Sequence, residues 1–483
     1  MPTSASPIRR LPATLLGLTC LALSALAQDP PRLAGHDERP DDAFVAVDRA
    51  SQPRSPGRVV TRGVFSSVQV NVDSLGNNIV GDAANEPSIA VDPNDPSRMV
   101  AGWRQFDTVT NNFRQAGWAY SHDGGATWTF PGSIEAGVFR SDPVVGVDNL
   151  GTFYYYSLAV PGGGFANDMF RSLDGGMTWS TPFFACGGDK AWLAIDRSGG
   201  MGDGHAYAFW TSSFSCAGAS GNFNRSTDGG MNWDPEVPVP IQWGTLDVAD
   251  DGNLYLIGTG GAGFSVLRST NAQDPNQGVL FDASTSVDLG GSLRVSAGPN
   301  PGGLLGQAWI ASNPVNGELY ALASVDPAGG DPLDVHFSRS TDGGATWSPP
   351  VRVNDDASTT AWQWFGTLSV APNGRIDVVW NDTRNDPGGL DSELFFSSSN
   401  DGGVTWSPNM ALSPSFDPLI GHPQQNKIGD YYDMVSFNDA AHLIWAATFN
   451  GEQDVYYLRI AGDELFADGF ESGDTSSWSA TVP

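Results

Sequence analysis

The chain has 483 residues and a formal net charge of −30. An acidic excess of this size argues against nucleic acid and anionic membranes as partners, because both would repel the protein. The 59 glycines, 33 prolines and 16 tryptophans indicate many tight turns and large buried rings, and no long helical periodicity follows the first thirty residues. The composition therefore predicts one large all-β domain.

The first residues predict export. Arg9 and Arg10 precede an apolar stretch from Leu11 to Leu26, and the small-x-small segment at 25–27 fits a signal peptidase site. We therefore expect residues 1–27 to be a signal peptide and the protein to be secreted or held at the cell envelope. No later segment is long and apolar enough to span a membrane. Residues 28–63 are rich in Pro, Arg and Asp, which predicts a flexible leader.

One pattern, Ser-x-Asp-x-Gly-x-Thr-Trp, occurs five times, at 121–128, 172–179, 226–233, 340–347 and 399–406. Its Asp carboxylate can accept backbone N–H groups of the same turn, and its Gly supplies the positive φ that a tight turn needs. The Trp can then pack against the neighbouring hydrophobic layer. Only Asn232 departs from the pattern, in place of Thr. Each copy predicts a β-hairpin corner.

The pattern resembles the Asp box, or BNR repeat, of sialidase-like β-propellers. The resemblance implies that each copy joins the third and fourth strands of a blade, on the face opposite the ligand site. The copies therefore indicate the fold and say almost nothing about the chemistry. Sialidases themselves have six blades.

The spacing of the copies predicts the number of blades. Neighbouring copies lie 51 to 59 residues apart, except that Asp228 and Asp342 are 114 residues apart, which is two repeats of 57. The segment 268–276 is the expected remnant of a lost copy. Apolar runs at 87–93, 143–148, 191–196, 244–250, 306–312, 366–372 and 432–437 mark the first strands of seven blades. We predict a single all-β propeller of seven blades over residues 64–462, with six blades as the alternative.

The two ends of the domain carry further expectations. The seventh repeat lacks its fourth strand, and residues 67–73 alternate as that strand should, so we expect them to pair with 454–460 and close the last blade. Residues 463–483 resemble a C-terminal tail of diverse secreted bacterial proteins. That resemblance implies a sorting or attachment element, and a disordered end is the alternative.

Two cysteines remain after removal of the signal peptide, Cys186 and Cys216. An export compartment permits a disulfide between them, and two buried thiols are the alternative. Neither has a His or second Cys at metal-ligand spacing. The run 381–386 offers clustered oxygen ligands for Ca²⁺, but its spacing fits no EF-hand loop and Asx turns explain it as well. We assign no metal and no cofactor.

The loops that enter each first strand, and those that join second and third strands, converge over the central channel of a propeller. The only two lysines, Lys190 and Lys427, both lie just before first strands. Acids, cations and aromatic rings share these positions, and such a mixture suits a sugar, because rings stack on pyranose faces while charged groups bond hydroxyls or a carboxylate. The candidate catalytic residues are Glu86, Asp142, Asp189, Asp430 and Tyr431, and the candidate substrate-binding residues are Arg104, Arg140, Lys190, Trp192, Trp243, Trp364 and Arg384. A polar rim whose acids and arginines only pair with each other is the alternative.

The family resemblance implies a catalytic set of three arginines, a Tyr nucleophile assisted by Glu, and an Asp acid/base, which departs from the two-carboxylate scheme. The Arg-Ile-Pro motif of that family is absent here, and Glu86-Pro87 stands in its place. Tyr431 or Tyr432 with Glu86 could supply a nucleophile and base across blades 7 and 1, yet no residue matches a family motif. The resemblance covers the scaffold, roughly residues 64–460, and stops short of the catalytic set.

Three functions stay open. The first is an exported glycoside hydrolase that acts through Asp142, Asp189 or Asp430. The second is a non-catalytic module that binds a glycan or a cell-surface protein on the same face. The third is a surface platform delivered by the tail. We favour a monomer that recognises a glycan or glycoconjugate, with sialidase-like hydrolysis as the activity that the resemblance suggests.

Overall fold

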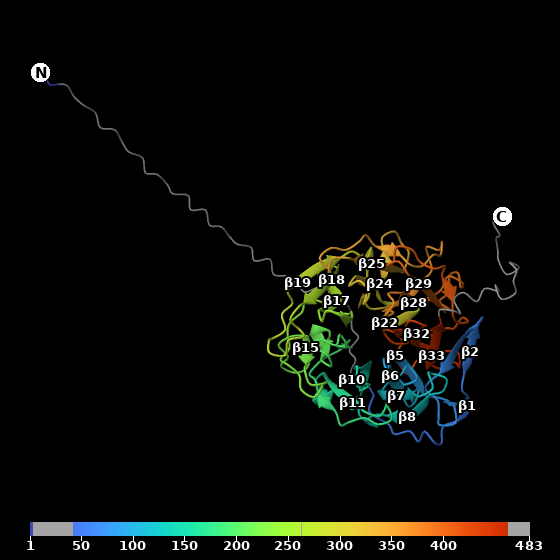
Figure 1. Ribbon diagram of the computed structural model, residues 1–483. Coiled ribbons are helices and arrows are strands. Elements are labelled where there is room, and N and C mark those ends of the chain that lie inside the picture. The colour runs from blue at the N-terminus through green and yellow to red at the C-terminus, as the bar shows by residue number, and fades with distance from the viewer. Residues whose placement is uncertain (3–41, 262, 462–483) are drawn as a thin grey trace. The chain divides into compact units, whose positions relative to one another are not determined.

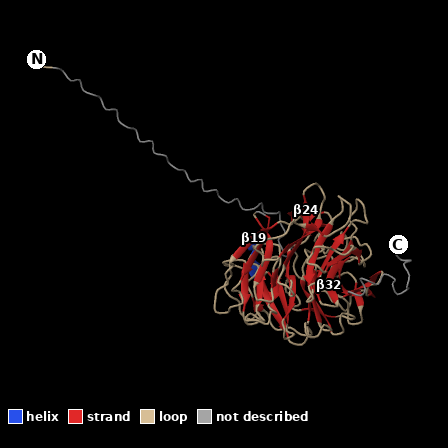
Figure 2. Cartoon of the chain, turned by 45° about the horizontal axis from the view of Figure 1, so that its top comes forward, coloured by secondary structure: helices blue, strands red, loops and turns tan. Residues whose placement is uncertain are grey.

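The computed structural model of the chain describes residues 1–2, 42–261 and 263–461. The remainder of the predicted signal peptide, the leader up to residue 41 and the predicted tail at 463–483 lie outside the described residues. Strands carry nearly all of the regular structure, beside two short 3-10 turns, η1 (Pro161–Gly163) and η2 (Ser212–Phe214) (Figure 2). No helix in the described part of the chain is long and apolar enough to cross a membrane.

Seven antiparallel sheets follow one another around a ring, which confirms the seven-bladed propeller (Figure 1). Each sheet starts with an inner strand at one of the seven predicted apolar runs. These inner strands are β5 (Ala83–Val91), β9 (Ser141–Val147), β13 (Trp192–Ile195), β16 (Leu246–Val248), β23 (Trp309–Ser312), β27 (Gln363–Val370) and β31 (Asp433–Ser436).

The remaining strands continue each blade outwards. Blade 1 continues with β6 (Met99–Phe106), β7 (Gln115–Ser121) and β8 (Thr129–Ser133). Blade 2 continues with β10 (Phe153–Ala159), β11 (Ala166–Ser172) and β12 (Phe183–Phe184). Blade 3 continues with β14 (Ala206–Phe209) and β15 (Phe223–Ser226). Blade 4 continues with β17 (Leu254–Gly260), β18 (Gly263–Ser269) and β19 (Ala283–Val287). Blade 5 continues with β24 (Leu319–Pro327), β25 (Asp334–Ser340) and β26 (Val351–Arg352), and β20 (Gly291–Ser292) pairs with β24. Blades 6 and 7 continue with β28 (Ile376–Asp382), β29 (Glu393–Ser399) and β30 (Met410–Ala411), then β32 (Ala440–Ala447) and β33 (Asp454–Ala461).

Each inner strand pairs with only one other strand of its own blade, so its second edge faces the axis. Side chains of the preceding blade cover part of this edge. Ser88 Oγ accepts the N–H of Val145 at 3.0 Å, and an Asp433 carboxylate oxygen accepts the N–H of Ile89 at 3.1 Å. Because a buried backbone N–H needs a partner, these bonds join neighbouring blades at the axis.

The five repeat copies form the expected corners, each directly after the third strand of its blade. Asp123 accepts the N–H of Thr127 at 2.9 Å on one oxygen and the Thr127 hydroxyl at 2.6 Å on the other. The same pair of bonds recurs in the other copies, and Asn232 donates its side-chain amide to Asp228 at 2.7 Å where the others use the Thr hydroxyl. Asn232 therefore keeps the turn although it breaks the pattern.

The lost copy in blade 4 retains part of this turn. It lies between β18 and β19, where the side chains of Ser269 and Asn271 bond at 3.1 Å. The Asn271 amide oxygen also accepts the N–H of Leu280 at 2.9 Å. An amide oxygen therefore takes the place of the Asp carboxylate, as expected for a decayed repeat.

The N-terminal segment closes the ring, as predicted. β3 (Phe65–Gln69) pairs with β33, with Ser67 opposite Leu458, so the closing strand begins at Phe65, earlier than expected. β2 (Val59–Arg62) adds a fifth strand to this sheet, and β1 (Arg54–Pro56) pairs with β4 (Asn77–Ile79). The prediction of a flexible leader is therefore wrong for β1 and β2. The physical reason is that β3 offers a free outer edge, which β2 covers.

We expect that deleting residues 1–73 lowers the melting temperature by about 10 °C or more relative to deleting residues 1–53. The longer deletion removes β1 to β3 and leaves β33 with an open edge, and each kcal/mol lost shifts the melting temperature of a large domain by about 2–4 °C. Thermal unfolding followed by circular dichroism measures the difference. Equal melting temperatures for the two truncated proteins would contradict closure by the N-terminal strand.

Candidate functional site

Three cations and four carboxylic acids meet at the end of the axis where the inner strands begin. We call this group the axial cluster. No member is more than 3% exposed. The members are Glu86, Arg104, Asp142, Asp189, Lys190, Lys427 and Asp430. All but Lys427 are among the candidate residues from the sequence, so the ring brings six of those candidates together.

Asp430 lies at the centre of the axial cluster. Its Oδ2 is 2.8 Å from Nζ of Lys190 and 2.8 Å from Nζ of Lys427. Lys190 also lies 3.3 Å from an oxygen of Asp189, and its backbone N–H donates to Asp142 Oδ2 at 2.7 Å. One carboxylate thus joins blade 3, which supplies Lys190, to blade 7, which supplies Lys427.

Glu86 extends the cluster to blade 1. Its Oε1 lies 3.3 Å from Lys427 Nζ and its Oε2 lies 3.1 Å from Arg104 Nε. Burial raises the pKa of the Glu86 carboxyl to about 8, because the cations Arg104 and Lys427 only partly offset the loss of solvation, and the negative charges of Asp430 and Asp142 oppose its ionisation. Glu86 therefore holds its proton to a higher pH than an ordinary glutamic acid does.

Unusual backbone turns aim several of these side chains at the axis. Glu86, Asp142 and Lys190 have φ values of 51°, 45° and 56°. Trp243 and Phe365 occupy the matching place in blades 4 and 6, with φ values of 57° and 60°. Such conformations cost a residue other than glycine on the order of 1 kcal/mol, and they concentrate at functional sites. In blades 1, 2 and 6 the register of the inner strand also shifts at this point, so the turn is a β-bulge that redirects one side chain.

A hairpin that the sequence analysis did not predict contacts the axial cluster at the channel mouth. β21 (Val295–Ala297) and β22 (Asn300–Leu304) form this hairpin, between blades 4 and 5. The N–H of Leu304 donates to Asp430 Oδ1 at 2.7 Å. Sequence reasoning missed this contribution, although the glycine-rich run 290–306 inside the longest interval between repeats could have indicated an inserted loop.

Three predicted residues lie beside the cluster with other roles. The hydroxyl of Tyr431 donates to the Pro143 carbonyl at 2.8 Å, and burial, reinforced by the charges of Glu86 and Asp142, raises its pKa well above the ordinary value. Trp192 is buried, its indole bonds Gln307, and its ring packs 5.0 Å from that of Tyr431. Trp243 is half-buried at the start of blade 4 and is the most accessible ring of the predicted set.

Three other predicted substrate-binding residues do not join the axial cluster, because their side chains bond partners elsewhere. Arg140 pairs with Glu135 and Asp168 in the outer part of blades 1 and 2. Trp364 is fully buried in the core between blades, where its indole donates to Ser392 Oγ at 3.1 Å. Arg384 pairs with Asp382 and Asp355 at 2.8 and 2.6 Å. Strand alternation and local ion pairs decide these orientations.

A cavity of about 230 Å³ does lie on the axis, between the inner strands of all seven blades. Its lining includes Trp192 and Trp309 together with aliphatic side chains, and Arg197 and Asp247 are its charged residues apart from Asp433. No residue of the axial cluster lines it. The cavity and the charged cluster are therefore separate features of the axis.

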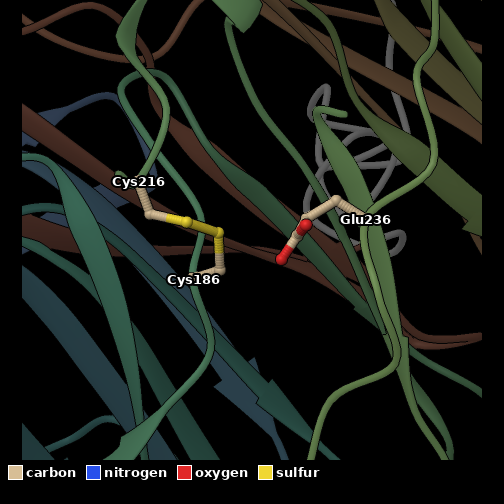
Figure 3. Close-up of side chains that lie close together, drawn as sticks. All are labelled: Cys186, Cys216 and Glu236. Carbon is tan, nitrogen blue, oxygen red and sulfur yellow. A yellow bond between two sulfur atoms is a disulfide. The ribbon is translucent and has the colours of Figure 1, made fainter. Parts of the chain in front are cut away.

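Cys186 and Cys216 form a disulfide, with their Cα atoms 5.3 Å apart. Glu236 lies beside it, and one of its oxygens and the two sulfur atoms lie within 4.8 Å of one another (Figure 3). Among the described residues this is the only such grouping of three. A disulfide sulfur is not the thiolate that binds a metal, so the grouping does not form a metal site.

The chain is similar in sequence to one enzyme and in fold to several solved structures. No protein-family model matches the chain. A xyloglucanase from a Paenibacillus species is 26% identical over 400 residues, which cover 74% of this chain and 36% of the relative. A protein of unknown function from Dyadobacter fermentans has a TM-score of 0.48 and 16% identity, covering 83% of this chain and 99% of that one. A sialidase from Trypanosoma rangeli has a TM-score of 0.41 and 14% identity, covering 89% of this chain and 66% of that one.

We expect Glu86→Gln to remove a pH dependence from the stability. The folded-state pKa of Glu86, about 8, lies above the ordinary value of 4.5, so the wild-type protein loses stability as the pH rises from 4.5 to 8. Gln mimics the protonated acid, and the variant should therefore match the wild type near pH 5 and melt several degrees higher near pH 8.

Asp454, whose pKa burial raises to about 7, is present in both proteins, so its contribution cancels in the difference. Melting temperatures of both proteins across this pH range are the measurement. Parallel curves would show that Glu86 is ionised throughout.

Proposed function

We propose that the protein acts on glycans as a glycoside hydrolase of the propeller type, with the axial cluster as its acid–base centre. One observation carries this proposal: Glu86 and Asp430 contact the same Lys427 ammonium, at 3.3 and 2.8 Å, and burial raises the pKa of the Glu86 carboxyl. Glycoside hydrolysis needs one protonated acid beside one carboxylate, and the environment must push their pKa values apart.

The residues take distinct roles in this proposal. Glu86 gives its proton to the oxygen of the leaving sugar. Asp430, paired with two lysines, is the carboxylate on the opposite side, where it takes a proton from the water that attacks the anomeric carbon. Asp142, whose oxygen accepts the Lys190 N–H, is the second candidate for that role.

A Tyr nucleophile of the sialidase type has less support. The Tyr431 hydroxyl is engaged by the Pro143 carbonyl, and its burial opposes formation of a phenolate. The similarity to a xyloglucanase agrees better with two-carboxylate chemistry on a neutral polysaccharide. Because the chain spans 36% of that relative, the substrate of the relative is a starting point for the assay only.

Further parts of the proposal concern the protein's location. The Asp-box pattern and the predicted signal peptide support an exported, sialidase-like propeller. We place it at the cell surface or outside the cell, with residues 463–483 as a sorting element.

A non-catalytic glycan-binding propeller is the second candidate, and one observation favours it. Every acid of the axial cluster is buried and has a partner within the protein, which is also the arrangement of a purely structural ion-pair network. In that case sugars would bind on the same face without being cleaved, and the half-buried Trp243 would supply a ring for stacking.

Turnover on a glycan panel distinguishes the two candidates. Purified protein is incubated with xyloglucan, other neutral polysaccharides and sialylated glycans, and released reducing ends or sialic acid are measured. We expect cleavage of a neutral polysaccharide, a loss of kcat of at least about a hundredfold in Glu86→Gln, and a pH profile that falls on its basic side near pH 8.

The matched control is Glu452→Gln, at a half-buried acid outside the cluster that accepts the Gly81 N–H, and it should retain activity. Binding without cleavage would favour the second candidate. An absence of both binding and cleavage across the panel would refute both.

A further inference from the structure

The axial cluster is closed by one small element that belongs to no blade. β21 and β22 pair only with each other, and the hairpin extends from between blades 4 and 5 to the loop that enters blade 7. Figure 1 shows β22 near the centre of the ring. The hairpin therefore lies where a ligand would have to approach the cluster.

The hairpin holds the loop that carries Lys427 and Asp430. The side-chain amide of Asn300 donates to the Gly429 carbonyl at 2.8 Å and accepts the N–H of Ile428 at 3.1 Å. The Leu304 N–H donates to Asp430 at 2.7 Å. These three bonds set the position of the central carboxylate.

Two glycines of the hairpin make close backbone contact with this loop, while Leu304 is buried and Ala297 packs against the core of blades 6 and 7. A Cβ atom at Gly302 would lie 2.6 Å from the Asn426 carbonyl oxygen, and one at Gly303 would lie 2.7 Å from an Asp430 oxygen. The two glycines therefore bring bare backbone against the loop. Each hydrogen bond contributes about 1 kcal/mol net, so opening must break these bonds and expose Leu304, which disrupts fewer contacts than unfolding a four-stranded blade.

The hairpin also has a suitable pivot. Leu305 is packed in the core of blades 6 and 7, and Gly306, with a φ of 142°, follows it. Glycine tolerates the dihedral changes that a hinge needs. Because Leu305 lies between the hairpin and Gly306, movement about Gly306 that lifts Asn300 and Gly302 off blade 7 also displaces Leu305.

We propose that the hairpin β21–β22 is a lid that opens to admit a glycan to the axial cluster and closes to exclude water. The identity of the ligand rests on the proposed function, whereas the opening itself does not. In the closed state the lid keeps Glu86 buried and protonated, and in the open state it exposes the acid and both lysines.

The two lysines make this opening measurable. Lys190 and Lys427 are the only lysines of the chain, and both lie in the axial cluster. Reductive methylation of the native protein, followed by mass spectrometry of the two lysine peptides, reports how often the lid opens. We expect labelling of the wild type at a rate well above that of global unfolding, and about tenfold faster labelling in Asn300→Ala, which loses two of the three bonds.

Asn354→Ala is the matched control. Asn354 is buried like Asn300, donates its amide to Asp334 at 2.6 Å and accepts the N–H of Val335 at 2.9 Å, but it lies between blades 5 and 6. We expect this variant to lose stability without faster lysine labelling. Labelling that follows the loss of global stability in both variants would overturn the lid.

Hydrogen exchange provides a readout on the wild type, should Asn300→Ala fail to fold. The amides of Leu304 and Ile428 should exchange faster than those of Val145 and Ile89, which are bonded between blades at the axis. Equal protection would overturn the lid. If the lysines label fast but the protein cleaves no glycan, the proposed function is refuted and the lid is not. If the protein cleaves a glycan but its lysines label only on global unfolding, the lid is refuted and the proposed function is not.

Discussion

The carboxylate of Asp430 is shared by the ammonium groups of Lys190 and Lys427, and the rest of the axis is arranged around this contact. Taking charges out of water is expensive, and their attraction offsets that expense only where each charge has well-placed partners. The propeller provides them from four blades at once, and the hairpin adds a backbone N–H. Loss of one partner would leave a buried charge uncompensated, at a typical cost of about 3–5 kcal/mol.

This constraint explains two features that otherwise seem unrelated. The pKa of Glu86 is raised because burial removes its carboxyl from water, and the nearby charges of Asp430 and Asp142 add to the effect of burial. The left-handed turns at Glu86, Asp142 and Lys190 are retained because an ordinary strand start would aim these side chains elsewhere. Backbone strain and a raised pKa are thus consequences of gathering one group of charges at the axis, and both properties are typical of an acid–base centre.

The fold could be predicted from local patterns, because the bonds that make each corner lie within one repeat. Asp123 and Thr127 are four residues apart and bond directly, so the sequence pattern reports the turn itself. Convergence of Glu86, Asp142 and Lys190 was also predictable, since a ring brings the starts of all inner strands together. What was not predictable depends on contacts between distant segments. The lid comes from residues with no strong strand pattern, and Trp364 and Arg384 turn away from the axis because Ser392 and Asp355 hold them.

The most direct measurement is the protonation state of Glu86 at neutral pH. An infrared difference spectrum between the wild type and Glu86→Gln isolates the carboxyl stretch of this one residue. The account predicts a protonated carboxylic acid band at pH 7 that is absent in the variant and disappears from the wild type as the pH passes about 8. A spectrum with only carboxylate bands at pH 7 would show that Glu86 is ionised in the closed structure and would contradict its proposed role as the acid.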